Sequence, residues 1–144
     1  PGHIVILAWW LTTEFSGALT SINCLANKFG EEDLATLLTA IEGTSVRSLC
    51  GLTEGQTTAD FSGQNLGPID MKIMAAEYGF QGFIGAVACM TLDGNKTIGA
   101  TGADSLMESI CTTRNTQIVK IEHDVGALQL PFQNIVVRTA CQIS

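Results

Sequence analysis

Three segments of the chain carry apolar side chains in the same order after a central glycine. Counted from Gly30, Gly67 and Gly99, apolar residues recur four, seven, eight and eleven positions further on. These are Leu34, Leu37, Leu38 and Ile41, then Met71, Met74, Ala75 and Tyr78, then Ala103, Leu106, Met107 and Ile110. Such spacing forms one face of a helix. The pattern therefore predicts helices over Glu31–Glu42, Pro68–Tyr78 and Ala100–Thr112.

Before each glycine the pattern changes to an alternation of apolar and polar residues. The apolar positions are Ile22 and Cys24, Ala59 and Phe61, and Met90 and Leu92. Alternation with a period of two is typical of a short strand with one buried face. Leu49 and Val119 fall where two further strands are due. The expected parallel strands are Thr20–Cys24, Arg47–Gly51, Thr58–Phe61, Cys89–Leu92 and Val119–Glu122.

An amide side chain follows the first, third and fourth of these strands, at Asn27, Gln64 and Asn95. This order of strand, amide turn and helix resembles the leucine-rich repeat family, in its ribonuclease-inhibitor-like branch with a full helix in each repeat. The signature L-x-x-L-x-L-x-x-N-x-L is matched by Leu19, Ile22, Cys24, Asn27 and Phe29, and, with one inserted residue, by Val87, Met90, Leu92, Asn95 and Ile98.

The resemblance implies an α/β fold: a right-handed leucine-rich-repeat solenoid with a parallel sheet on the concave face and helices on the convex face. It also implies that the amides of Asn27 and Asn95 are buried and hydrogen-bond the turn backbone of their own and the neighbouring coil. Gln64 departs from the usual asparagine, so the middle turn is expected to be looser or differently bonded. The whole chain, 1–144, is expected to form a single domain, with repeats over 17–122 between segments 1–16 and 123–144.

Both ends of the chain are apolar and outside the repeat register. The run from Ile4 to Leu11 is too short to span a bilayer. It can form a strand or helix that caps the core, because solenoids need capped ends, or it can dock on another subunit or on lipid. Segment 128–137 alternates like an edge strand with a bend at Pro131, and 123–144 is expected to form an irregular C-terminal cap or a docking surface.

Composition favours a compact domain that does not bind nucleic acid. Hydrophobic residues make up 46% of the chain and charged residues 15%, which is unlike a disordered chain. The formal net charge is −7 and the seven basic residues are scattered, so no basic stripe is available for phosphates. None of the five cysteines forms a C-x-x-C pair. Their odd number and spacing favour an intracellular, reducing compartment.

Candidate chemistry is sparse. His3 and His123 have no cysteine or glutamate nearby at zinc-binding spacing, and the segment from Asp93 to Asp104 departs from a calcium loop at its sixth and twelfth positions. The glycosylation sequon at Asn95 is expected to be unmodified, because the repeat register buries that side chain. We therefore expect no cofactor, no metal and no small-molecule substrate.

Two functional hypotheses follow. The first is a non-catalytic protein-protein interaction module that serves as a small accessory or structural subunit of a larger assembly, with membrane contact only through the N-terminal apolar run or a partner. Its binding residues would be Trp9 and Trp10 with the exposed strand positions Thr20, Ser21, Asn23, Arg47, Ser48, Thr58, Asp60, Thr91, Lys120 and Glu122. The second is a thiol or hydrolytic enzyme that uses Cys50 or Cys89 with His123, although no third group orients the candidate base.

Overall fold

The computed structural model of the chain describes residues 2–11, 13, 17–27, 30–95, 97–112, 120–122 and 135–136. Its elements in chain order are α1 (Gly2–Leu11), α2 (Glu31–Ile41), β1 (Thr58–Asp60), α3 (Pro68–Gly79), the 3-10 helix η2 (Phe83–Ala86), β2 (Cys89–Thr91), α4 (Gly99–Thr112), β3 (Lys120–Glu122) and β4 (Ile135–Val136).

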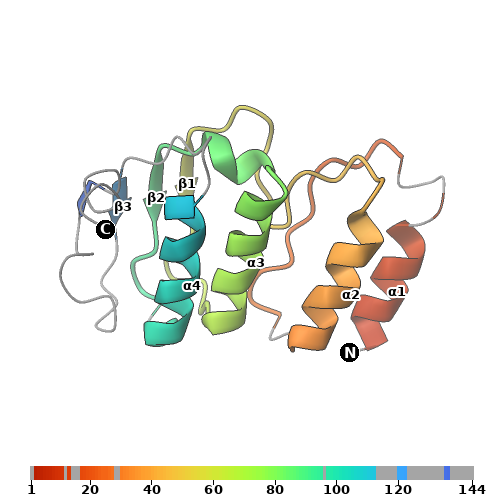
Figure 1. The fold of residues 1–144 in the computed structure, drawn as a ribbon, viewed down its shortest axis with the longest axis horizontal. Coiled ribbons are helices and arrows are strands. Elements are labelled where there is room, and N and C mark those ends of the chain that lie inside the picture. Colours follow the sequence, from red (N-terminus) through yellow and green to blue (C-terminus); the bar gives the residue numbers. More distant parts are fainter. Residues whose placement is uncertain are drawn as a thin grey trace.

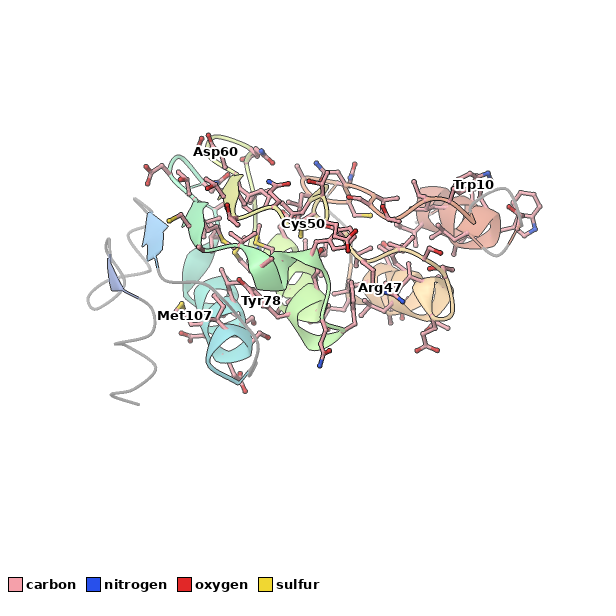
Figure 2. The ribbon with its side chains drawn as sticks, turned by 90° about the horizontal axis from the view of Figure 1, so that it is seen from above. Trp10, Arg47, Cys50, Asp60, Tyr78 and Met107 are labelled. Carbon is pink, nitrogen blue, oxygen red and sulfur yellow. The ribbon has the colours of Figure 1, made fainter. Side chains whose placement is uncertain are left out.

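The helices stand side by side with the short strands behind them (Figure 1). Seen from above, β1 and β2 form one layer and α3 and α4 form the other (Figure 2). The helices pack in two pairs, α1 against α2 and α3 against α4, whereas α2 and α3 share few close contacts. The row of helices is therefore divided in the middle.

The three predicted helices are confirmed to within one residue at their ends. Two of them begin after a glycine whose N–H is bonded by an aspartate three residues further on. Asp33 Oδ2 accepts from Gly30 N at 3.2 Å, and Asp70 Oδ2 accepts from Gly67 N at 2.8 Å. These bonds satisfy backbone donors that a helix start leaves unpaired.

One hydrophobic core lies between the helices and the strand layer. The apolar positions that define the three helical faces contribute Leu34, Leu37, Ile41, Met71, Met74, Tyr78, Leu106, Met107 and Ile110. The strand side contributes Cys24, Leu49, Ala59, Phe61, Met90 and Leu92. Most of the apolar positions that the two periodic patterns identified are therefore buried, whereas Ile22, Leu38 and Ala75 are half-buried.

The expected solenoid with a parallel sheet along its concave face is wrong. The sheet has the order β1-β2-β3-β4, and β1, β2 and β3 pair in parallel over three residues each, with Ala59 opposite Met90 and Met90 opposite Ile121. β4 pairs antiparallel to β3. The strands expected at Thr20–Cys24 and Arg47–Gly51 form only two isolated bridges, one parallel and one antiparallel.

Side chains explain why the segment before β1 does not join the sheet. The Ser48 hydroxyl accepts hydrogen bonds from the backbone N–H groups of Cys50 and Leu52 at 3.2 and 3.1 Å, and the Glu77 carboxylate accepts from Leu49 N at 2.7 Å. A neighbouring strand would otherwise accept from such donors. The Gln56 amide donates to Thr58 O at 2.8 Å, which blocks part of the β1 edge.

The two ends of the chain differ in how far the structure describes them. The N-terminal apolar run is helical, as α1. The expected edge strand over 128–137 is represented by β4 alone, and Pro131 lies outside the described residues, as does most of segment 123–144. The division of the chain into one domain with two capping segments stays a prediction.

Candidate docking surface

Helix α1 presents apolar side chains on two opposite sides. Its ten residues include no Asp, Glu, Lys or Arg. On the inner side Ile4 and Leu11 are each 2% exposed and Leu7 is partly buried against the core. The other side, which we call the outer face, consists of Val5, Ile6, Trp9 and Trp10, exposed by 63, 65, 66 and 36%.

Helical geometry separates these two faces. At 3.6 residues per turn, residues three and seven positions after Ile4 fall on its side of the helix, and the four outer residues fall on the opposite side. A helix that is apolar all round is normally buried all round. The outer face of α1 instead lies at one end of the molecule, where Figure 2 labels Trp10. The inner side of the N-terminal run covers the core, as the capping interpretation expects, and the outer face is exposed. Docking through that face stays a prediction.

The strand positions expected to bind a partner do not form one surface. Thr20, Asn23, Thr58 and Asp60 are exposed, and Ser21 and Thr91 are half-buried. Ser48 is fully buried, so its expected role in binding is wrong. Lys120 and Glu122 lie in β3, but their side chains are outside the described part of the structure.

Arg47 is exposed, yet it lies away from the strand layer that carries Asp60 (Figure 2). Its guanidinium Nη1 donates to the carbonyls of Thr44 and Val46 at 3.1 and 2.9 Å. Arg47 lines a groove of about 470 Å³ between the C-terminal ends of α2 and α3, with Leu38, Ile41, Glu42, Gly43, Val46, Ala76 and Phe80. The groove separates the two helix pairs.

Glu77 of α3 forms a buried polar centre that sequence reasoning missed. Its carboxylate is fully buried and accepts hydrogen bonds from Ser48 Oγ at 3.0 and 3.2 Å, Leu49 N at 2.7 Å and Ile84 N at 2.8 Å. Burial raises the pKa of the Glu77 carboxyl, and the hydrogen bonds to its ionised form oppose that shift. The signal in the sequence was its spacing, three positions after Met74 and four after Ile73, which places Glu77 beside the apolar face.

The cysteines do not have the properties of an activated nucleophile. Cys50 hydrogen-bonds the Glu77 carboxylate, and burial together with that negative charge raises the pKa of its thiol well above the usual value. Burial raises the pKa of Cys24 to about 11. A thiol must ionise to act as a nucleophile. Cys89 is exposed, and its proposed partner His123 lies outside the described residues.

The expected amide bonds are confirmed at one turn and wrong at another. Asn95 is fully buried, its Nδ2 donates to Phe61 O and Leu92 O at 2.8 and 2.9 Å, and its Oδ1 accepts from Gln64 N and Leu66 N. This burial agrees with an unmodified sequon. Asn27 is exposed, and among the described residues its amide donates to Cys24 O and Leu25 O, both in its own turn.

The turn that carries Asn27 is linked to α3 by Asp70, at the start of that helix. Its Oδ1 accepts from Ala26 N at 2.9 Å. The middle turn is bonded differently, as one of the two expectations had it: Gln64 is exposed, and its amide makes a long 3.5 Å bond to Asp60 O. The backbone of this turn is bonded by Asn95 Oδ1, which accepts from Gln64 N and Leu66 N.

Comparison with known proteins gives no identification: no family model, no curated protein and no solved structure matches the chain. The resemblance to leucine-rich repeats therefore has no support beyond the sequence motif. Among the residues that the structure describes, no helix is long and apolar enough to cross a membrane. Across those same residues, no three His, Cys, Asp or Glu side chains are grouped to hold a metal ion.

Proposed function

We propose that this chain is a non-catalytic protein-protein interaction module that serves as an accessory or structural subunit of a larger assembly. The outer face of α1 supports this proposal most directly. Two adjacent tryptophans and two aliphatic side chains share one uncharged helical face, and Trp9 is 66% exposed. Exposed apolar patches of this kind mark sites of interaction, and tryptophan is enriched among the residues that contribute most to binding.

A protein partner fits this face better than a lipid surface. Helices that lie on membranes usually carry Lys and Arg on their polar side, where they meet anionic lipids. Helix α1 has no Lys or Arg, and the chain has a formal net charge of −7. The negative charge disfavours approach to an anionic membrane, whereas an uncharged apolar face suits an apolar surface on another protein.

The enzyme hypothesis has less support. The thiols of Cys24 and Cys50 are buried and protonated at neutral pH. The free thiols in the described part of the chain, Cys24, Cys50 and Cys89, support our inference of an intracellular, reducing compartment.

The test is partner capture by the immobilised full chain. Wild type and the double variant Trp9→Ser with Trp10→Ser are compared, with Thr20→Ala and Asp60→Ala together as the control on the strand side. We expect a partner identified by mass spectrometry to rebind the wild type when purified, to bind the tryptophan variant at least tenfold more weakly, and to bind the control normally. Equal binding by all three chains would contradict docking through α1.

Reactivity of the thiols tests the enzyme hypothesis separately. We expect iodoacetamide at neutral pH to leave Cys24 and Cys50 unmodified in the folded chain, because ionisation of both thiols is suppressed by burial. Rapid alkylation of Cys50 in the folded state would restore the thiol-enzyme hypothesis.

A further inference from the structure

We propose that the outer face of α1 pairs with the same face of a second copy of the chain, so that the two copies form a two-fold dimer through antiparallel α1 helices. The proposal rests on the proposed function and specifies what occupies its docking surface.

The packing of α1 within one copy supports this arrangement. Helix α1 already packs its inner side against α2, and α3 packs against α4. A second apolar helix packed against the outer face of α1 would add one more helix to this side-by-side row. Helix α1 supplies the required partner itself, because its outer face is apolar and has no charge to desolvate.

The sequence of the outer face is complementary to itself in the antiparallel orientation. If the two-fold axis passes between residues 7 and 8, Ile6 and the partner's Trp9 lie at the same height beside the contact line. Each of these indoles then packs next to a smaller aliphatic side chain, an arrangement that lets the two faces interdigitate. Val5 and Trp10 lie at the two edges of the face, about 140° apart around the helix. Antiparallel helices also bring opposite ends of their dipoles together.

Charge directs self-association to this face. Each copy has a formal net charge of −7, so most approaches of two copies bring like charges together. Exposed carboxylates flank the other helices, including Glu32 of α2 and Asp104 and Glu108 of α4. Helix α1 has none, so two copies can meet there without a direct clash of charge.

The area of the outer face predicts that the dimer is weak. With the exposed fractions given above, its four side chains present roughly 400 to 500 Å². A stable interface buries about 800 Å² on each partner. We therefore expect a weak, reversible dimer, because the face falls short of the area that stable interfaces bury.

The test is sedimentation velocity on the full chain from low to high micromolar concentration. We expect the wild type to change from monomer to dimer and Trp9→Glu to stay monomeric, with at least a tenfold weaker association. Ala35→Glu is the matched control, since it adds the same charge at an exposed position of α2 and should dimerise like the wild type. Circular dichroism checks the folding of each variant.

A second measurement needs no variant. Acrylamide quenching of wild-type tryptophan fluorescence should fall as concentration rises, because pairing covers both indoles. A wild type that is monomeric and equally quenched at every concentration would overturn the dimer, and so would loss of dimerisation in Ala35→Glu. If the dimer is absent but a captured protein still requires Trp9 and Trp10, only the dimer fails and the interaction module stands. If neither association occurs, both proposals fail.

Discussion

At the scale of single residues, Glu77 connects parts of the molecule that are distant in sequence. One carboxylate accepts hydrogen bonds from Ser48 and Leu49 on one side and from Ile84 on the other. Apart from the Cys50 thiol, the donors that the structure gives it are backbone N–H groups and a hydroxyl, so neutral dipoles stabilise its charge. Such an arrangement holds only while every donor stays in place.

The buried carboxyl of Glu77 predicts a pH-dependent stability. Its pKa in the folded chain is raised above the unfolded value of about 4.5, so folding favours the protonated form. Its contribution is fully present below pH 4.5 and is lost as pH rises through the folded pKa. We expect Glu77→Gln to remove this part of the pH dependence, as measured by urea unfolding from pH 4 to pH 8. Parallel curves for wild type and variant would contradict the assignment.

Asn95 and Asn27 should differ sharply when each is truncated. Asn95→Ala leaves the carbonyls of Phe61 and Leu92 and the N–H groups of Gln64 and Leu66 without their partner, at a cost of about 1 to 3 kcal/mol of unfolding free energy for orphaned buried groups. Asn27→Ala should cost well under half as much, because that side chain is exposed. Chemical denaturation measures both.

Asn65 supplies a control for this comparison. Its φ is +58°, a conformation that asparagine and glycine tolerate better than alanine, so Asn65→Gly should be nearly neutral. Equal losses of stability in Asn95→Ala and Asn27→Ala would show that the buried amide bonds are not what fixes these turns.

Sequence reasoning was right for one of the two asparagines in the repeat motif and wrong for the other. Asn95 was correctly expected to be buried, although its motif carries one inserted residue. The errors lie where a side chain far along the chain makes the deciding contact, which no local pattern reveals. Ser48 occupies an outward position of an expected strand, but Glu77 of α3 draws its hydroxyl inward. Asn27 loses its expected role because Asp70, far along the chain, bonds that turn.

At the scale of elements, helices α2, α3 and α4 were predictable and most strand pairing was not. Each of these three helices carries a glycine at or just before its start and an apolar face of about three turns, so its bounds follow from local sequence. The sequence left α1 open between a strand and a helix and did not predict η2. Strands of three residues have too little sequence to fix their pairing, which depends on which neighbour offers hydrogen bonds. Before β1, the side chains of Ser48 and Glu77 accept hydrogen bonds from backbone N–H groups that could otherwise donate to a neighbouring strand. A periodic pattern of apolar residues does not reveal such side-chain bonds.

The connection between α3 and η2 requires a glycine at position 82. A Cβ there would lie 2.3 Å from Arg47 O and 2.5 Å from Glu77 Cγ. The contact with backbone cannot be relieved by a rotamer change, so we expect Gly82→Ala to lower unfolding free energy by about 1 to 3 kcal/mol, the range for overpacked sites. Gly85→Ala within η2 is the control, because nothing lies within 4 Å of its Cβ position. A thermal melt of Gly82→Ala equal to that of Gly85→Ala would contradict the close approach.

At the scale of the whole molecule, the hydrophobic core was predictable and the architecture was not. The apolar faces of the helices and strands converge on one core, as periodicity indicated. The expected solenoid needs continuous stacking of like units. The structure interrupts that stacking where α2 and α3 separate and where the sheet becomes mixed at β4.

The two sides of α1 should respond differently to substitution. Leu11→Ala removes a side chain that is 2% exposed and should cost about 2 to 5 kcal/mol, as for other buried leucines. Trp9→Ser removes a largely exposed side chain, so it should change unfolding free energy by less than about 0.5 kcal/mol, as is usual at surfaces. Urea unfolding at low protein concentration separates the two. A large loss in Trp9→Ser would mean that the indole packs within its own chain.

The bonds from Leu49 N and Ile84 N to Glu77 should couple the local opening of two distant segments. The amides of Leu49 and Ile84 are bound by its carboxylate instead of by a strand or helix partner. In amide hydrogen exchange, both should therefore exchange slowly and at matching rates, although they lie 35 positions apart. Because one side chain holds both, the two amides should open as a unit, and Glu77→Gln should raise both exchange rates together.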